Sequence, residues 1–189
     1  MANRKENDMS DDQIVRNCAP TLAGIKTGSL FNVSISSDSD FKKDIISFNR
    51  SMREKGVRII PLKICETYAL IYLYRPDMLG RDLSDPMAAD ILKRFGYSLN
   101  SSDSCVAGLV RRLKSSPMFP HEIGLFLGYP PADVDGFIKS PNEGFCEVGY
   151  WKVYSDAEKA RRVFRRYKQC TEEYGRMLRS GRTLEQLVV

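Results

Sequence analysis

The residues best suited to chemistry are the single histidine, His121, and a cysteine beside an expected helix break, Cys18. The ring of Pro20 clashes with the carbonyl four residues earlier, so we expect one helix to break near Cys18 and a second to open at Pro20. A helix N-terminus stabilises a thiolate, which is both a nucleophile and a metal ligand. Cys18 and His121, with Glu122 orienting the imidazole, are therefore the candidate catalytic residues.

Both residues also have a purely structural interpretation. Cys18 continues the apolar stripe of Ile14 and Leu22, and free cysteine is among the most buried residue types. His121 lies in the first turn of a predicted helix, where its ring can bond a neighbouring carbonyl. Nothing in the sequence brings Cys18 and His121 together, so both interpretations stay open.

Four further residues are candidates for ligand binding: Lys26, Thr27, Tyr129 and Trp151. Lys26 and Thr27 could contact an anion, although no phosphate-loop spacing surrounds them. Trp151 lies among other aromatic residues and could floor a pocket for a planar ligand, with core packing as the alternative. Residues 18–26 and 120–129 form the predicted binding surface, because both combine irregular Pro and Gly backbone with apolar residues.

A basic helix is expected between Lys159 and Lys168, with aromatic residues interleaved. Such a helix could follow a phosphate backbone through four arginines, Arg161, Arg162, Arg165 and Arg166. Nearby glutamates dilute this charge, and the formal net charge of the chain is only +5. The sequence therefore favours a solvated helix face and disfavours a nucleic-acid partner.

No set of side chains has the spacing of a metal site. The chain has one histidine and five cysteines, and the cysteines include no Cys-x-x-Cys pair. We therefore predict no metal site, and the cofactor, if any, stays unknown. An odd number of widely spaced cysteines favours reduced thiols. No apolar run approaches the roughly 20 residues of a membrane span, so we expect a cytoplasmic protein without membrane contact.

Hydrophobic periodicity predicts the elements that position these residues. Alternating or continuous apolar runs predict strands over 30–35, 57–64, 68–74 and 148–154. Pro61 cannot donate to a ladder, which predicts an edge or bulged second strand, whereas the continuous apolar run of the third predicts a central one. The last long helix is expected to begin at a capping box formed by Ser155 and Glu158.

Residues 119–131 carry the densest helix punctuation in the chain. Pro120 suits a first helical turn, Gly128 can adopt the left-handed conformation that ends a helix, and Pro131 can open another. This pattern predicts a tight helical hairpin. A buried strand from Ile123 to Leu127 is the alternative, because a short apolar run alone does not separate the two.

The order of these elements predicts an α+β fold. We expect a ferredoxin-like βαββαβ sheet, with a helical insertion at about 77–139 in the second crossover and extra N- and C-terminal helices. The edge position of the second strand and the central position of the third agree with that topology. At 189 residues the chain suits one domain, so we expect a flexible leader over 1–9 and a single domain over 10–189.

Four stretches resemble a family of small proteins from anaerobic, largely clostridial bacteria that is labelled only as a domain of unknown function. They are CAPTLAGIKT at 18–27, ALIYLYR at 69–75, FPHEIGLFLGYP at 119–130 and GYWKVY at 149–154. The resemblance covers nearly the whole chain and implies a bacterial protein. It supplies no activity, cofactor or catalytic residue, although the surroundings of the relatives point to redox or iron physiology.

Our leading hypothesis is a module that binds a small ligand or a protein partner without chemistry of its own, because no complete catalytic constellation is evident. The first alternative is a thiol-dependent enzyme or a redox or iron-related protein that uses Cys18 with His121. The second is nucleic-acid binding through the basic C-terminal helix.

Overall fold

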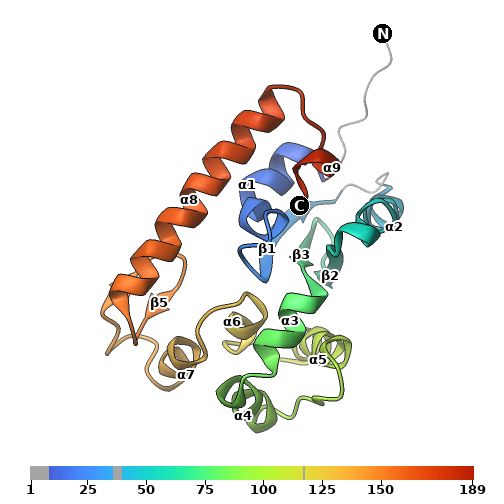
Figure 1. Cartoon of the computed structure of the whole chain (residues 1–189). Coiled ribbons are helices and arrows are strands. Elements are labelled where there is room, and N and C mark those ends of the chain that lie inside the picture. The colour runs from blue at the N-terminus through green and yellow to red at the C-terminus, as the bar shows by residue number, and fades with distance from the viewer. Residues whose placement is uncertain (1–8, 36–39, 117) are drawn as a thin grey trace. The chain divides into compact units, whose positions relative to one another are not determined.

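The computed structural model describes residues 9–35, 40–116 and 118–189 (Figure 1). Its main sheet has three antiparallel strands. Its strands are β1 (Gly28–Ser34), β2 (Arg58–Ile64) and β3 (Tyr68–Tyr74), in the order β1-β3-β2. The central position of β3 is thus confirmed. β2 lies at an edge, with a register shift between Pro61 and Lys63, so the edge strand predicted from Pro61 is also confirmed.

The chain divides into two compact units. The first consists of Met1–Arg75 and Cys170–Val189, and the second of Pro76–Gln169, so the long helix α8 (Ala157–Arg179) contributes to both. The leader expected over residues 1–9 lies outside the described residues except for Met9, which packs into the core of the first unit. The single domain expected over 10–189 stays a prediction.

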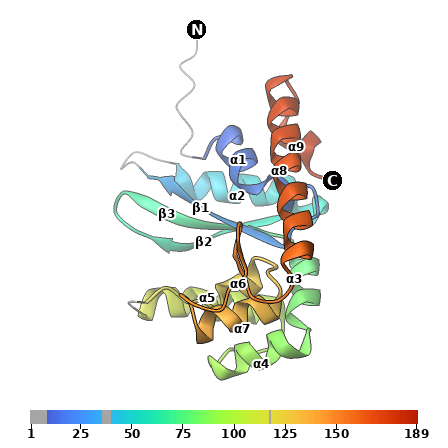
Figure 2. The ribbon, with the colours of Figure 1, turned by 90° about the vertical axis from the view of Figure 1, so that its left-hand side faces the viewer.

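The helices of the first unit pack on one face of its sheet (Figure 2). They are α1 (Asp11–Leu22), α2 (Phe41–Met52), the 3-10 helix η1 (Arg53–Lys55), α9 (Leu184–Leu187) and the last turns of α8. Ser10 caps α1, accepting a hydrogen bond from the backbone N–H of Gln13 at 3.2 Å. Alternate residues of the strands, such as Phe31 and Val33 on β1, point into the core.

One break predicted in this unit does not occur: α1 runs through Cys18 and Pro20 without interruption. Pro20 lies in the last turn of α1. Because proline has no N–H, the one helical hydrogen bond that it removes is the bond to the carbonyl of Arg16, four residues earlier. The Pro20 carbonyl accepts hydrogen bonds from the N–H groups of Ile25 and Lys26 at 3.0 and 3.1 Å. Cys18 is therefore near the C-terminal end of a helix, and the argument for a thiolate at a helix N-terminus is wrong.

The second unit is mainly helical. Its elements are α3 (Pro76–Leu83), α4 (Pro86–Arg94), α5 (Ser102–Ser115), α6 (Ile123–Phe126), α7 (Pro131–Lys139), β4 (Glu147–Val148), β5 (Lys152–Val153) and the first turns of α8. The helices α3 to α7 lie between residues 76 and 139, the stretch in which the sequence predicts a helical insertion. Together the two units show an α+β protein.

The fourth strand of the predicted ferredoxin-like sheet is wrong. Within the described residues the main sheet has three strands, and the stretch 148–154 instead contributes to the separate two-residue hairpin β4–β5. The chain turns where the N–H of Gly149 donates to the carbonyl of Trp151 at 3.1 Å. A Cβ at Gly149 would lie 2.2 Å from the ring of Phe164, so only glycine allows this close packing of the turn on α8.

Candidate functional site

The punctuated segment 119–131 forms the helical hairpin expected from its prolines and glycine. Residues Ile123–Phe126 are helical in α6, so the strand alternative is wrong. Gly128 takes the left-handed conformation with φ 75°, and Pro131 occupies the first position of α7. A Cβ at Gly124 would lie 2.9 Å from Val134, so the glycine lets α6 approach α7 closely.

This hairpin and the β4–β5 hairpin enclose a pocket of about 360 Å³, which we call the aromatic pocket. It is lined mostly by rings and aliphatic side chains, with a few polar groups. The lining residues are Phe119, His121, Ile123, Gly124, Tyr129, Asp133, Val134, Phe137, Trp151 and Lys152. Of the residues predicted to form a site, His121, Tyr129 and Trp151 thus come together in one place.

Stacked rings form one wall of the aromatic pocket. The rings of Tyr129 and Trp151 are stacked at 4.8 Å, and Phe164 of α8 meets Trp151 edge-on at 4.6 Å. Burial, and secondarily the nearby Tyr150, raises the pKa of Tyr129 to about 12, so its hydroxyl stays protonated at neutral pH. The wall is therefore a neutral aromatic surface.

Asp133 holds this wall in place. Its buried carboxylate accepts a hydrogen bond from the indole N–H of Trp151 at 2.7 Å. It also accepts from the backbone N–H groups of Tyr154 and Ser155 and from the Ser155 hydroxyl, each at 2.8 Å. The Ser155 hydroxyl is thus engaged, and Asp156 caps α8 instead, accepting from the N–H of Lys159 at 2.9 Å. The capping box predicted from Ser155 and Glu158 is wrong.

His121 and Lys152 supply polar groups to the pocket. The His121 ring meets Phe137 edge-on at 4.9 Å, and no described residue is placed to hydrogen-bond its nitrogens. The Lys152 ammonium donates to the carbonyl of Pro141 at 2.6 Å and lies 4.8 Å from the centre of the Phe145 ring. An ammonium has three donors, so Lys152, which lines the pocket, keeps donors beyond the one bound to Pro141.

Glu122 does not orient the His121 imidazole. Its fully buried carboxylate lies 2.5 Å from Arg112 and accepts a hydrogen bond from the Tyr97 hydroxyl at 3.0 Å. Arg112 in turn lies over the ring of Phe95, 5.0 Å from its centre. Glu122 therefore belongs to a buried polar cluster that joins α5 to the start of the hairpin, and its candidate catalytic role is not supported.

A second and more polar pocket, of about 560 Å³, shares Tyr129, Asp133 and Trp151 with the aromatic pocket. Its polar lining carries both signs of charge, from Arg81, Asp82, Asp85, Asp156 and Lys159. Among the residues of the aromatic pocket that sequence analysis missed are Phe119, Asp133, Phe137 and Lys152. Their only local signals were proximity to Trp151 and to the hairpin.

The candidates from the first unit are buried. Cys18 is 0% exposed, and burial raises the pKa of its thiol to about 12, although the nearby Lys26 and Ser29 oppose the shift. The Lys26 ammonium donates to the Gly28 carbonyl at 2.6 Å, and burial lowers its pKa to about 8. Thr27 is also buried, and its carbonyl accepts from the N–H of Arg75. Cys18 and His121 belong to different units, and their pairing stays a prediction.

The arginines of α8 differ in their surroundings. Arg161 pairs with Glu147 and Arg162 with Glu158, each at 2.5 Å, whereas Arg165 and Arg166 are exposed. Among residues 9–35, 40–116 and 118–189, no group of three or more His, Cys, Asp or Glu side chains is placed to hold a metal ion. In the same ranges, no helix combines the length and apolar character needed to cross a membrane.

Comparison with known proteins gives one match. The sequence model of a family described as "Protein of unknown function (DUF3793)" matches residues 14–188. No curated protein and no solved structure matches the chain. The family resemblance predicted from the four sequence stretches is thereby confirmed.

Proposed function

The chain belongs to the DUF3793 family of proteins of unknown function, and we propose that its second unit binds a small, planar and largely apolar molecule in the aromatic pocket. The observation that carries this proposal is the convergence of His121, Tyr129 and Trp151 on one pocket of about 360 Å³. Binding sites for small molecules are typically cavities of roughly 300–1,000 Å³ with mostly apolar walls and a few polar groups. We assign the pocket binding and no reaction.

The side chains of the pocket indicate which ligand would fit. The Tyr129–Trp151 stack offers a flat ring face, and Phe137 offers a ring edge beside His121. The His121 nitrogens and the remaining Lys152 donors favour a ligand with a hydrogen-bonding or acidic group. A flat ring system with one acidic substituent satisfies both requirements.

Trp151 is the only tryptophan of the chain and lines the pocket, so its fluorescence reports directly on binding. The probe 8-anilino-1-naphthalenesulfonate combines a flat naphthalene ring system and an aniline ring with one sulfonate. We expect it to quench Trp151. Phe137→Ala and Phe119→Ala should each weaken its affinity about fivefold, because each removes a ring contact of roughly 1 kcal/mol.

The matched control is Met118→Ala, which removes an exposed apolar side chain next to Phe119 that does not line the pocket. Its affinity for the probe should equal that of the wild type. Equal affinity in all three variants, with their thermal stability intact, would show that the probe binds elsewhere and would remove the proposal.

The thiol-enzyme alternative requires a reactive Cys18, and burial that raises its pKa argues against a thiolate there. We also propose that the protein is cytoplasmic, because none of its five cysteines, Cys18, Cys65, Cys105, Cys146 and Cys170, forms a disulfide in the described residues. A membrane-fractionation experiment on the source cells tests this, and recovery of the protein in an exported fraction would contradict it.

A further inference from the structure

A second surface of the same unit lies where the β4–β5 turn packs on α8. Gly149, Tyr150, Phe164, Arg165 and Lys168 line a shallow groove of about 390 Å³, which we call the α8 shelf. The Tyr150 ring is 43% exposed and lies 5.7 Å from the Phe164 ring. The floor of the shelf is thus aromatic, and its rim is formed by two cations.

The two rim cations are not neutralised by neighbouring carboxylates. Glu147 and Glu158 are engaged by Arg161 and Arg162. Within the described part of the chain, neither Arg165 nor Lys168 has an acidic side chain within ion-pair distance. Of the glutamates on this helix, Glu158 pairs with Arg162 and Glu173 with Arg176.

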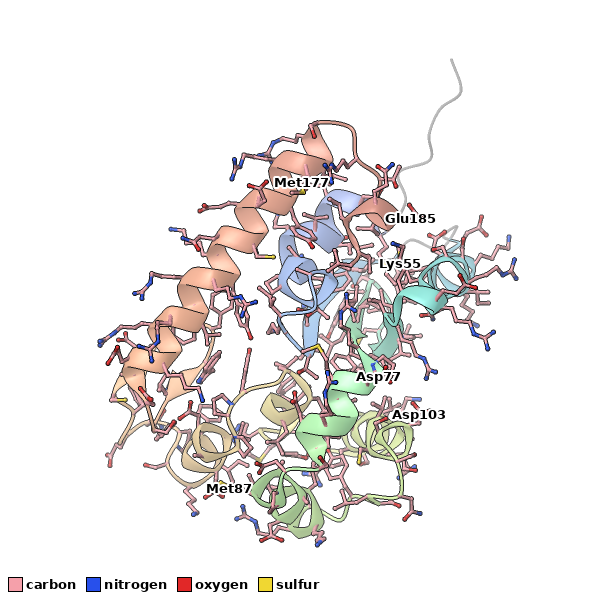
Figure 3. The ribbon with its side chains drawn as sticks, viewed as in Figure 1. Lys55, Asp77, Met87, Asp103, Met177 and Glu185 are labelled. Atoms are coloured by element: carbon pink, nitrogen blue, oxygen red, sulfur yellow. The ribbon has the colours of Figure 1, made fainter. Side chains whose placement is uncertain are left out.

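The spacing of the cations follows one edge of the shelf. Residues 161, 165 and 168 recur at intervals of four and three, so they lie along one face of α8 over roughly 10 Å at 1.5 Å per residue. Figure 3 shows nitrogen-tipped side chains projecting along this helix. The shelf thus offers a row of positive charge beside two flat rings.

We propose that the α8 shelf binds single-stranded nucleic acid, with a base stacked on Tyr150 and Phe164 and the backbone phosphates on Arg165 and Lys168. Proteins that bind single strands combine a positively charged track with aromatic side chains on which bases stack. A duplex hides the faces of its bases and could use only the cations. The single strand is the partner that uses both parts of the shelf.

A lipid surface is a poorer fit. Helices that lie in a bilayer interface bury a broad apolar face, whereas residues 161, 162, 165, 166 and 168 of α8 are charged and exposed. The exposed large apolar side chains of this surface are Val148 and Tyr150 on the hairpin. The shelf is independent of the aromatic pocket in its chemistry, and either proposal can fail without the other.

The test is fluorescence anisotropy of a labelled oligothymidylate of about 20 nucleotides at low salt, a length that covers more than one typical site. We expect the double variant Arg165→Glu/Lys168→Glu to weaken binding at least tenfold and to lower the slope of log affinity against log salt by about 1.4, the value for two lost phosphate contacts. Tyr150→Ala should weaken binding about fivefold or more through lost stacking. Tyr150→Phe keeps the ring and should bind as the wild type.

Lys114→Glu provides the matched charge control, because it reverses an exposed cation on α5, outside the shelf. It should change affinity less than twofold. The proposal is overturned if no binding is measurable, if Lys114→Glu weakens binding as much as Arg165→Glu/Lys168→Glu, or if Tyr150→Ala has no effect. Equal affinity for a duplex of the same length, or preferential binding to vesicles of anionic phospholipid, would also overturn it.

Discussion

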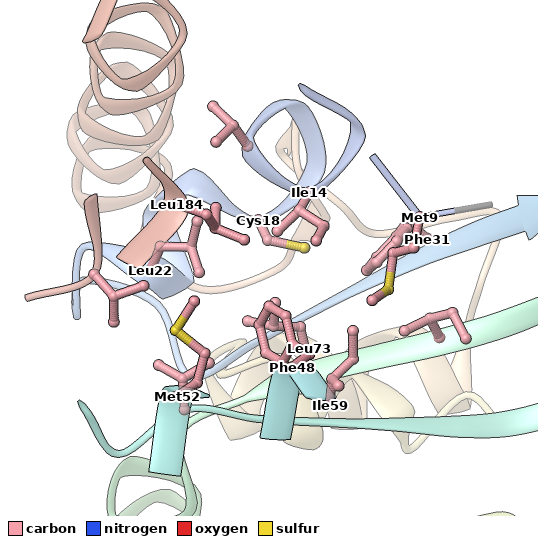
Figure 4. Packing of buried hydrophobic residues seen from close by; sticks show 14 of the residues in the cluster. Met9, Ile14, Cys18, Leu22, Phe31, Phe48, Met52, Ile59, Leu73 and Leu184 are labelled. Atoms are coloured by element: carbon pink, nitrogen blue, oxygen red, sulfur yellow. The ribbon is translucent and has the colours of Figure 1, made fainter. Parts of the chain in front are cut away.

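Cys18 and Lys26 of the first unit are sealed in its interior, whereas His121, Tyr129 and Trp151 of the second unit line a pocket. Figure 4 shows the Cys18 sulfur among apolar side chains that include Ile14 and Leu73, and the polar groups that act on its thiol are Lys26 and Ser29. Around Trp151 the neighbours are stacked rings with polar groups at their edges. The two units therefore place their candidate residues in opposite surroundings, a closed core in the first and a pocket wall in the second.

The comparison teaches that the reactivity of a side chain does not by itself locate a functional site. The Cys18 thiol is the more reactive group in principle, yet burial raises its pKa to about 12 and suppresses the thiolate. Tyr129 and Trp151 are less reactive, but both line a cavity large enough for a ligand, and Asp133 accepts a hydrogen bond from the Trp151 indole. This contrast supports the proposal that the second unit carries the binding site.

The largest expected effect tests whether Cys18 is shielded from solvent in the folded protein. We expect iodoacetamide to modify Cys18 at least about 10³-fold more slowly than the exposed Cys146 in the folded protein, because Cys18 reacts only when the core opens. Peptide mapping by mass spectrometry at successive times measures both rates in one sample. Rapid modification of Cys18, with a rate that reaches its plateau well below pH 8, would revive the thiol enzyme.

The next largest effect tests whether Asp133 holds the pocket wall. Asp133→Ala leaves the N–H groups of Trp151, Tyr154 and Ser155 without their buried acceptor. We expect the free energy of unfolding to fall by about 4 kcal/mol, since each hydrogen bond to a buried charge contributes roughly 1.5–3 kcal/mol and some relaxation follows. Urea unfolding followed by Trp151 fluorescence measures the loss.

Asp156→Ala is the control for this substitution, because it removes a carboxylate from the exposed cap of α8. Loss of a helix cap costs about 1 kcal/mol. If Asp133→Ala costs no more than Asp156→Ala, the buried carboxylate is not the support of the wall, and the contrast between the two units loses its basis.

Local signals in the sequence predict much of this structure. Gly128 and Pro131 mark the hairpin, and Pro61 marks an edge strand, as the structure confirms. Each signal depends on the backbone preference of one residue or of its immediate neighbours. Such preferences act over a single turn, so they can be recognised without knowing what packs against the segment.

The errors come from contacts between residues far apart in the chain. The aromatic stretch 148–154 has the composition of a strand, but Asp133 binds its tryptophan and its backbone, and Gly149 packs against Phe164. No local sequence pattern predicts that Asp133 and Phe164 contact this stretch. The helix break predicted from Pro20 is wrong for another reason. The effect of a proline depends on how near it lies to the end of its helix, and Pro20 lies in the last turn of α1.

The site is predicted only in part for the same reason. Tyr129, His121 and Trp151 attract attention as rare or aromatic residues, and their convergence depends on the two hairpins. Asp133 looks like an ordinary acid in the first turn of α7, where a carboxylate favours the positive end of a helix. Its long-range hydrogen bonds become visible only in the structure.

The smallest predicted effect concerns the pH dependence of the sealed core. Burial lowers the pKa of Lys26 to about 8 in the folded state, against about 10.4 in an unfolded chain. The unfolded state therefore binds more protons above pH 8, so this group makes stability rise with pH until the unfolded pKa is passed. Between pH 8 and 9 we expect wild type to gain about 1 kcal/mol over Lys26→Met in urea unfolding.

Comparing the two proteins at each pH isolates Lys26 from the titration of Cys18. The raised pKa of Cys18 acts in the opposite direction, because its folded state keeps the proton that the unfolded thiol loses above about pH 8.5. That contribution is present in both proteins and largely cancels in the difference. A stability gap that stays constant from pH 8 to 9 would mean that Lys26 titrates as an exposed lysine, and the first unit would then be open to solvent where we describe it as sealed.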